Sequence, residues 1–244
     1  MSILRTSTIE PEGATTTLTL GASGDTVTSS ADSLKVNTFK DAGGNTLFTS
    51  DGSGTLSSVN SALKGGLIFI SSQTASDSAS VEFTSNIDSS YREYVFYYTR
   101  INPATDSTTF NISFSSDSGS TYGLTKTSTN FYAWHKDNGT SSALDYQGGS
   151  DLADSTAVAQ LAHSLGNDAD QCSGGEFRLF NPSSTTYVKN FLARTQSCMG
   201  DGSGDYSTDT FVGGYIDTTS VVNAVRFAMG SGNFDGTIAM YGTG

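Results

Sequence analysis

The feature of this sequence that most limits its possible folds is the close spacing of its turn signals. Clusters of Gly, Ser, Asn and Asp recur along the chain, and the short segments between them alternate apolar with polar side chains. Phe110, Ile112 and Phe114 fall on one face of such a segment, because successive side chains of a strand point to opposite sides. This alternation has the two-residue period of a β-strand, so we expect an all-β fold.

The composition and the later part of the chain favour a β-sandwich. The chain has 244 residues with 27 Gly and 3 Pro, and its 14 Phe and 11 Tyr are residue types that favour strands. We expect strands at residues 67–70, 79–83, 94–98, 109–114, 130–134, 176–180, 187–193, 210–216, 221–229 and 237–241. This series predicts a jelly-roll-like sandwich over residues 67–244.

Residues 1–66 differ from the rest of the chain. They contain neither tryptophan nor tyrosine, and strand-like runs such as residues 34–39 and 46–48 offer few apolar side chains. Burying so little surface does not offset the ordering of a backbone, which costs about 1–2 kcal/mol per residue. We therefore expect an extended docking arm or stalk that borrows a hydrophobic surface from other chains, for example in a homotrimer. A flexible polar linker is the alternative.

The charge balance excludes some classes of partner. The net charge is −12, and the 12 Lys and Arg residues are scattered between Arg5 and Arg226. A nucleic-acid-binding protein needs a positive face, so we expect no nucleic-acid partner. The sequence has no run of about 20 apolar residues, which predicts no membrane insertion. Its first residues lack the apolar region of a secretory signal, so we expect the chain to fold in a cytoplasm.

Motifs for catalysis are scarce in this sequence. No serine has glycine two positions before and two positions after it, and no phosphate-binding glycine loop occurs. His135 and His163 are the only histidines, and no triad partner accompanies either of them in the sequence. We expect a non-enzymatic protein. Two of the 24 acidic residues could still meet in space as a glycan-cleaving pair, and the sequence cannot nominate them.

Tyr132, Trp134 and His135 form a candidate glycan-binding set. They lie at the end of an expected strand, next to the polar segment Lys136–Gly139. Aromatic rings there could stack on a sugar while neighbouring polar groups bind its hydroxyls. The alternative is that Trp134 is a buried core residue.

One polar loop resembles a calcium site. Asp201, Ser203, Asp205 and Asp209 provide oxygen atoms at alternate positions, in the way that a calcium loop surrounds its ion. Tyr206 stands where such loops have glycine, and Val212 stands where they have a bidentate glutamate. Calcium is the one cofactor that the sequence suggests, and a polar hairpin loop without metal is the alternative.

Two local features stay open at this level. Residues 155–166 fit an amphipathic helix and also a strand, since apolar residues recur at both periods. Cys172 and Cys198 are the only cysteines, and a hairpin formed by residues 176–180 and 187–193 would place them near the same end of adjacent strands. A disulfide is geometrically feasible there, whereas reduced thiols fit a cytoplasmic protein.

Six segments together suggest a family. They are Leu34–Thr38, Asn45–Phe48, Asp51–Val59, Ile101–Asp106, Phe180–Lys189 and Ser231–Ile238. In combination they resemble virion structural proteins of marine tailed bacteriophages, which are described as tail-fibre-like or decoration-type. No catalytic residues carry over from these proteins. The resemblance implies a β-rich virion component that is assembled in the infected cytoplasm and displayed on the particle.

Together with the layout of an arm followed by a sandwich, the resemblance suggests partners. A short chain without a long fibre shaft would be an appendage on tail or capsid, contacting other virion proteins, its own copies and a host cell-surface glycan. A capsid decoration protein without a receptor role is one alternative. A soluble carbohydrate-binding lectin or a glycan-cleaving enzyme is another.

Overall fold

The computed structural model describes residues 37–50, 52–53, 56–57, 59, 66–200 and 205–243. Every regular element among these residues is a β-strand, which confirms the all-β prediction. The chain divides into two compact units, residues 1–60 and 61–244. In the described part of the chain, no helix is long and apolar enough to cross a membrane.

The N-terminal unit contains a small antiparallel sheet. Its strands are β1 (Thr38–Lys40), β2 (Thr46–Ser50) and β3 (Leu56–Ser57), in that spatial order. The β1–β2 turn closes where Asp41 Oδ1 accepts a hydrogen bond from the Asn45 backbone N–H at 2.8 Å. The rings of Phe39 and Phe48 stack with centroids 5.1 Å apart, yet no side chain of residues 37–50 is buried. Within residues 37–50, a stacked ring pair thus takes the place of a core.

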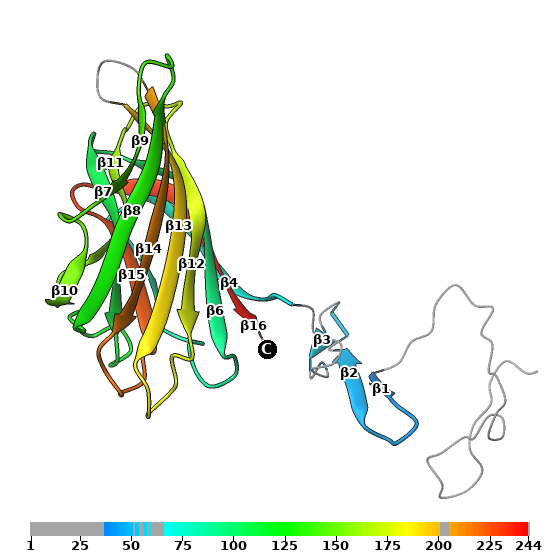
Figure 1. The fold of residues 1–244 in the computed structure, drawn as a ribbon. Helices are drawn as coiled ribbons and strands as arrows, with labels where there is room; N and C mark the ends of the chain where they lie inside the picture. The colour runs from blue at the N-terminus through cyan, green and yellow to red at the C-terminus, as the bar shows by residue number, and fades with distance from the viewer. Residues whose placement is uncertain are drawn as a thin grey trace, which may run out of the picture. The chain divides into compact units, whose positions relative to one another are not determined.

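The C-terminal unit is a sandwich of two antiparallel sheets. The larger sheet has the order β10 (Leu152–Ser155), β8 (Lys126–Lys136), β14 (Asp205–Ile216), β13 (Lys189–Gly200), β12 (Ser173–Phe180), β6 (Glu93–Pro103), β16 (Phe234–Thr243) and β4 (Ile68–Ser78), and β9 (Ser142–Tyr146) also pairs with β8. The smaller sheet has the order β11 (Ala159–Leu165), β7 (Thr108–Ser115), β15 (Ala224–Met229) and β5 (Ser80–Phe83). Figure 1 shows β8, β14, β13 and β12 of the larger sheet in front.

The strand pairing is that of a jelly roll with insertions. β4 pairs with β16, β5 with β15, β6 with β12 and β7 with β11, so the first four strands of the unit pair with later strands in nested order. A jelly roll consists of two four-stranded sheets whose strands pair in this nested order. β8, β9 and β10 are inserted between β7 and β11, and β13 and β14 between β12 and β15, and all five widen the larger sheet.

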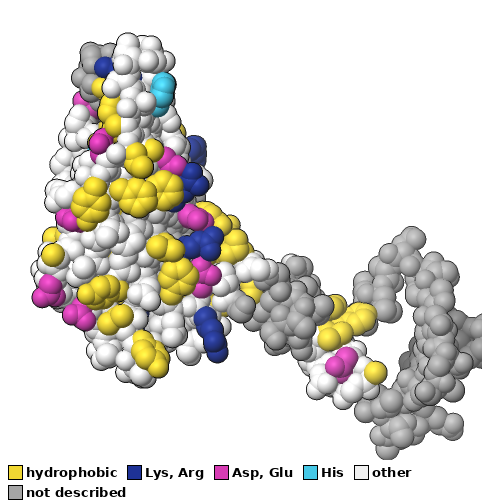
Figure 2. Space-filling model, viewed as in Figure 1, with side chains coloured by type: hydrophobic (Ala, Val, Ile, Leu, Met, Phe, Trp, Pro, Cys, Tyr) yellow, Lys and Arg dark blue, Asp and Glu magenta, His cyan; other side chains and the backbone are white. Residues whose placement is uncertain are grey.

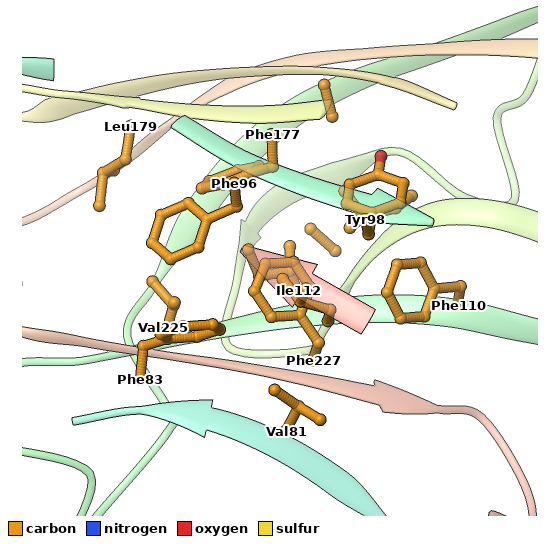
Figure 3. Close-up of a cluster of buried hydrophobic side chains, with 14 of the residues drawn as sticks. Val81, Phe83, Phe96, Tyr98, Phe110, Ile112, Phe177, Leu179, Val225 and Phe227 are labelled. Atoms are coloured by element: carbon orange, nitrogen blue, oxygen red, sulfur yellow. The ribbon is translucent and has the colours of Figure 1, made fainter. Parts of the chain in front are cut away.

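Aromatic side chains fill the space between the two sheets. The larger sheet contributes Phe96 and Phe177, and the smaller sheet contributes Phe110, Ile112 and Phe227. All five are fully buried, and Figure 3 shows them pointing toward one another. Fully burying such a side chain stabilises the fold by about 1.5–3 kcal/mol, so this cluster holds the two sheets together.

Residues 155–166 are extended and not helical. They contribute the end of β10 and the whole of β11, whose pairing with β7 is irregular around Ala162. Ala159, Leu161, Ala162 and Leu165 are all buried, although strict alternation would turn Ala162 outward. The irregular register therefore lets apolar residues of mixed spacing reach the core, which explains why the sequence also fitted a helix.

The two cysteines lie side by side, Cys172 just before β12 and Cys198 within β13, and are not bridged. The Cys198 backbone N–H donates to the Cys172 carbonyl oxygen at 3.1 Å, which places the residues opposite each other. Both thiols are free; Cys172 is exposed and Cys198 is half-buried. Burial, and then the nearby Asp205 and Asp170, raise the pKa of the Cys198 thiol.

Two buried lysines lie at one end of the larger sheet. Lys126 in β8 and Lys189 in β13 both pair in register with Ile216 of β14. Lys126 Nζ donates to the Leu124 carbonyl at 2.9 Å, and Lys189 Nζ donates to the carbonyls of Tyr187 and Thr218. Burial lowers the pKa of Lys126 to about 8, because the charged ammonium loses its hydration.

Replacing Lys126 with Met should stabilise the sandwich at pH 7 by on the order of 1–3 kcal/mol, because a buried positive charge is removed. In the native chain, the free energy of unfolding should rise between pH 8 and pH 10, since there the unfolded chain binds a proton that folded Lys126 has lost. Lys126→Met should flatten this rise in urea titrations. The exposed Lys40→Met is the control, and an unchanged slope with lower stability at pH 7 would contradict the argument.

Candidate functional site

The larger sheet has an outer face that is turned away from the smaller sheet. Along β8, Ser128 and Asn130 are buried whereas Thr129 and Phe131 are exposed, so alternate residues mark the two faces. The pairing of β8 with β14 is continuous, which carries the same alternation into the neighbouring strand. Figure 2 shows exposed hydrophobic side chains beside basic and acidic side chains on the body of the molecule.

The structure separates the glycan-binding set that the sequence suggested. Tyr132 and Trp134 belong to the inner side of β8, whereas His135 belongs to the outer face. Tyr132 packs edge-on against His163 with ring centroids 4.3 Å apart, and burial lowers the pKa of His163. Trp134 Nε1 donates to Asp145 Oδ2 at 2.8 Å. Asp145 also pairs in register with Tyr132, so Tyr132 and Trp134 both neighbour Asp145, and His135 does not join them.

The structure also changes the interpretation of the calcium loop. Asp201 and Ser203 lie outside the described residues. Asp205 and Asp209 both belong to strand β14, where four residues span about 13 Å, so they do not surround one ion. Asp205 Oδ1 accepts from Gln171 Nε2 at 2.9 Å. Within the described ranges, no three His, Cys, Asp or Glu side chains gather in a way that could hold a metal.

A single row of side chains crosses the outer face from β9 to β6. Each member pairs in register with the next: Tyr146, Phe131, Phe211, Arg194, Glu176 and Tyr97. Five steps between strands give this central row a length of about 24 Å. The rings of Phe131 and Phe211 stack with centroids 5.1 Å apart, and the Arg194 guanidinium lies 5.0 Å from the centre of the Phe211 ring.

Ion pairs fix the arginines of the outer face. Arg194 binds both carboxylate oxygens of Asp209, with Nε–Oδ1 at 3.0 Å and Nη2–Oδ2 at 2.6 Å. Arg178 joins Glu93 at 3.0 Å and Glu176 at 3.2 Å. The hydrogen bond that Arg194 donates to Asp209 raises the pKa of Arg194, and the one that Arg178 donates to Glu176 raises the pKa of Arg178. Both guanidinium groups are thus held in defined positions on an exposed surface.

Two glycines create hollows on either side of the central row. Gly174 pairs with Gln196 in the row on one side, and Gly213 pairs with Leu192 in the row on the other. The polar hollow is lined by Tyr97, Gly174, Gly175, Glu176, Arg194, Gln196 and Asp209. The apolar hollow is lined by Thr129, Phe131, Glu176, Arg178, Phe180, Leu192, Ala193, Arg194, Phe211, Val212 and Gly213. Glu176 and Arg194 line both hollows.

The polarity of the sheet is reversed around the central row. On the inner side of β14, Thr208, Thr210 and Val212 are buried. Phe211, which lies between Thr210 and Val212, faces outward. On β8, Asn130 is buried and Phe131 is 40% exposed. A sheet with one solvated face normally places its apolar side chains inside. Burial alone therefore does not account for the outward aromatic rings.

Sequence reasoning missed the central row. Phe131 and Phe211 lie within two of the expected strands, at residues 130–134 and 210–216. In each strand the aromatic residue alternates with its chain neighbours, so its ring points to the opposite face from theirs. That alternation was a usable signal for a face with outward aromatic rings. The pairing of these two strands, which brings the rings together, has no signal in the sequence.

Comparisons with known proteins do not add a relative. No protein-family model matches the chain, and no curated protein or solved structure is significantly similar to it.

Replacing Arg194 with Lys should leave the sandwich folded, with a change in melting temperature of less than about 2 °C, because exposed ion pairs add little stability. The Arg194 side chain is 61% exposed. A lysine at this position keeps the positive charge but cannot bind both carboxylate oxygens of Asp209 as the guanidinium does. Thermal unfolding followed by circular dichroism checks this. Arg178→Lys is the matched comparison, and a large drop for Arg194→Lys would show that the pair is structural.

Proposed function

We propose that this chain is a non-enzymatic structural protein of a tailed-phage particle, displayed on tail or capsid as a short fibre-like appendage. The N-terminal unit docks on other virion proteins, and the outer face of the sandwich contacts a host cell-surface glycan. The single observation that carries the recognition role is the central row, with three outward aromatic rings followed by Arg194 and Glu176.

The chemistry of the central row supports a binding role. Exposed groups of aromatic side chains mark interaction sites, and Tyr, Trp and Arg are the residues that most often dominate binding energy. Here Phe131 is 40% exposed and Tyr146 is 59% exposed. Stacked rings suit the apolar face of a sugar, and the neighbouring ion pairs offer donors and acceptors for its hydroxyl groups.

The layout of the chain supports a mounted appendage. The described part of the N-terminal unit has no buried side chain between residues 37 and 50, so a partner surface would complete it. A homotrimer with threefold symmetry is the assembly we propose, because closed symmetry lets three copies share one core. The resemblance to marine phage virion proteins is the reason for proposing a phage particle. In this proposal the protein is assembled in the host cytoplasm.

Removing the two stacked rings should weaken attachment. We expect the double variant Phe131→Ser with Phe211→Ser to lower the binding of fluorescently labelled protein to host cells by about thirtyfold or more, since a central aromatic anchor contributes about 2 kcal/mol or more. Tyr187→Ser is the control, because Tyr187 is 70% exposed and lies outside the outer face, between β12 and β13. Equal binding of the double variant and the control would remove the recognition role.

The location of the protein tests the particle role separately. Antibody labelling should place the chain on purified phage particles, and deletion of residues 1–60 should abolish its incorporation. A low copy number per particle would indicate a tail fibre, and a high copy number a capsid decoration protein. A protein that is absent from particles but binds cells would be a soluble lectin and would contradict the proposal.

A further inference from the structure

We propose that the polar hollow is a subsite for one neutral pyranose unit, with Tyr97 as its stacking surface; this rests on the glycan-binding function proposed above. The hollow exists because Gly174 has no side chain beside Gln196, its partner on β13. A Cβ at Gly174 would meet only the Tyr98 carbonyl oxygen, at 3.4 Å. The backbone there is open to substitution, and the space above it is not filled.

Tyr97 provides an aromatic wall for this space. It is half-buried on β6, opposite Glu176, and its ring lies edge-on to Tyr241 with centroids 5.7 Å apart. That contact restrains the Tyr97 ring at the border of the hollow. A restrained ring binds at a lower entropy cost than a free one, and its face suits the C–H groups of a sugar ring.

The polar groups around the hollow provide alternating acceptors and donors. Glu176 Oε2 accepts from Arg178, and no hydrogen bond reaches Glu176 Oε1 within the described residues. The Gln196 amide donates to the Ser197 carbonyl at 3.2 Å and to Ser207 Oγ at 3.0 Å, which leaves Oε1 as the free acceptor. Arg194 uses Nε and Nη2 for Asp209 and keeps Nη1 as a donor. Adjacent sugar hydroxyls both donate and accept, so they match this set.

The charge of the hollow selects a neutral sugar. Both arginines near it are already paired, Arg194 with Asp209 and Arg178 with Glu93 and Glu176. These three carboxylates exceed the two guanidinium groups by one, and the whole chain carries a net charge of −12. An acidic sugar or a phosphate would face this excess of negative charge without a free arginine, so it should bind less well.

A longer glycan has a path out of the hollow. Arg194 lines both hollows, so a chain of sugars anchored beside Tyr97 would cross it toward Phe211 and Phe131. The central row provides about 24 Å for this contact, from five strand spacings. The polar hollow would thereby select one sugar unit of the glycan. The aromatic rings would add affinity that depends less on which sugars follow it.

The test uses an array of neutral hexose oligosaccharides and matched uronic-acid oligosaccharides, probed with the full-length protein. Gly174→Leu should fill the hollow and lower the binding of neutral oligosaccharides by about tenfold, while Gly174→Ala should lower it less, because binding here depends on the free space. Tyr97→Phe should keep most of the binding, and Tyr97→Ser should lose it. Gly123→Leu is the control, because a Cβ there meets nothing within 4 Å and its neighbour Tyr122 lies under Arg226 of the smaller sheet.

The outcomes separate the subsite from the wider function. If Gly174→Leu binds neutral oligosaccharides like the native protein, the polar hollow is not the subsite, whereas the glycan-binding function stands. A preference for uronic acids would overturn the assignment of a neutral sugar. If no oligosaccharide binds while labelled protein still attaches to cells, the subsite falls. If attachment to cells also fails, the proposed function falls with it.

Discussion

The ring of Phe227 lies at the centre of the contact between the two sheets, and the rest of the sandwich is arranged around it. It is fully buried and has ring contacts with Phe96, Tyr98 and Phe177 of the larger sheet and with Phe83 and Phe110 of its own. Aromatic pairs of this kind add about 0.5–1.5 kcal/mol beyond their burial. The nested pairing of a jelly roll brings β15, β7 and β6 to this one place, so topology and core packing support each other.

The outer face depends on the strands inserted into this jelly roll. β6 and β12 belong to the basic wrapping and supply Tyr97 and Glu176, whereas the inserted β13, β14 and β8 supply Arg194, Phe211 and Phe131. The smaller sheet gained no matching strands, since it ends at β11. The inserted strands consequently bury several hydroxyl-bearing residues and turn aromatic rings outward. The central row thus begins on the strands of the basic jelly roll and continues on the inserted strands.

Much of the fold was accessible from the sequence because strand formation is a local property. The alternation of Phe110, Ile112 and Phe114 placed β7 correctly, and all three are fully buried. β9 was missed, because Ser142–Tyr146 is short and has too few apolar side chains to show the alternation of a strand. Residues 155–166 could not be assigned, since only the irregular pairing of β11 with β7 decides which of their side chains reach the core.

The sequence by itself determined that the chain forms many strands, that a sandwich occupies its later part, and that its first part offers little to bury. Tertiary structure decided which strands are neighbours, and with that the candidate site. Phe131 meets Phe211, and Glu176 meets Tyr97, only through pairing between distant strands. It also separated His135 from Tyr132 and Trp134. The physical reason is that alternation fixes which side chains share a face of one strand, whereas the neighbours on that face depend on which distant strands pair within the sheet.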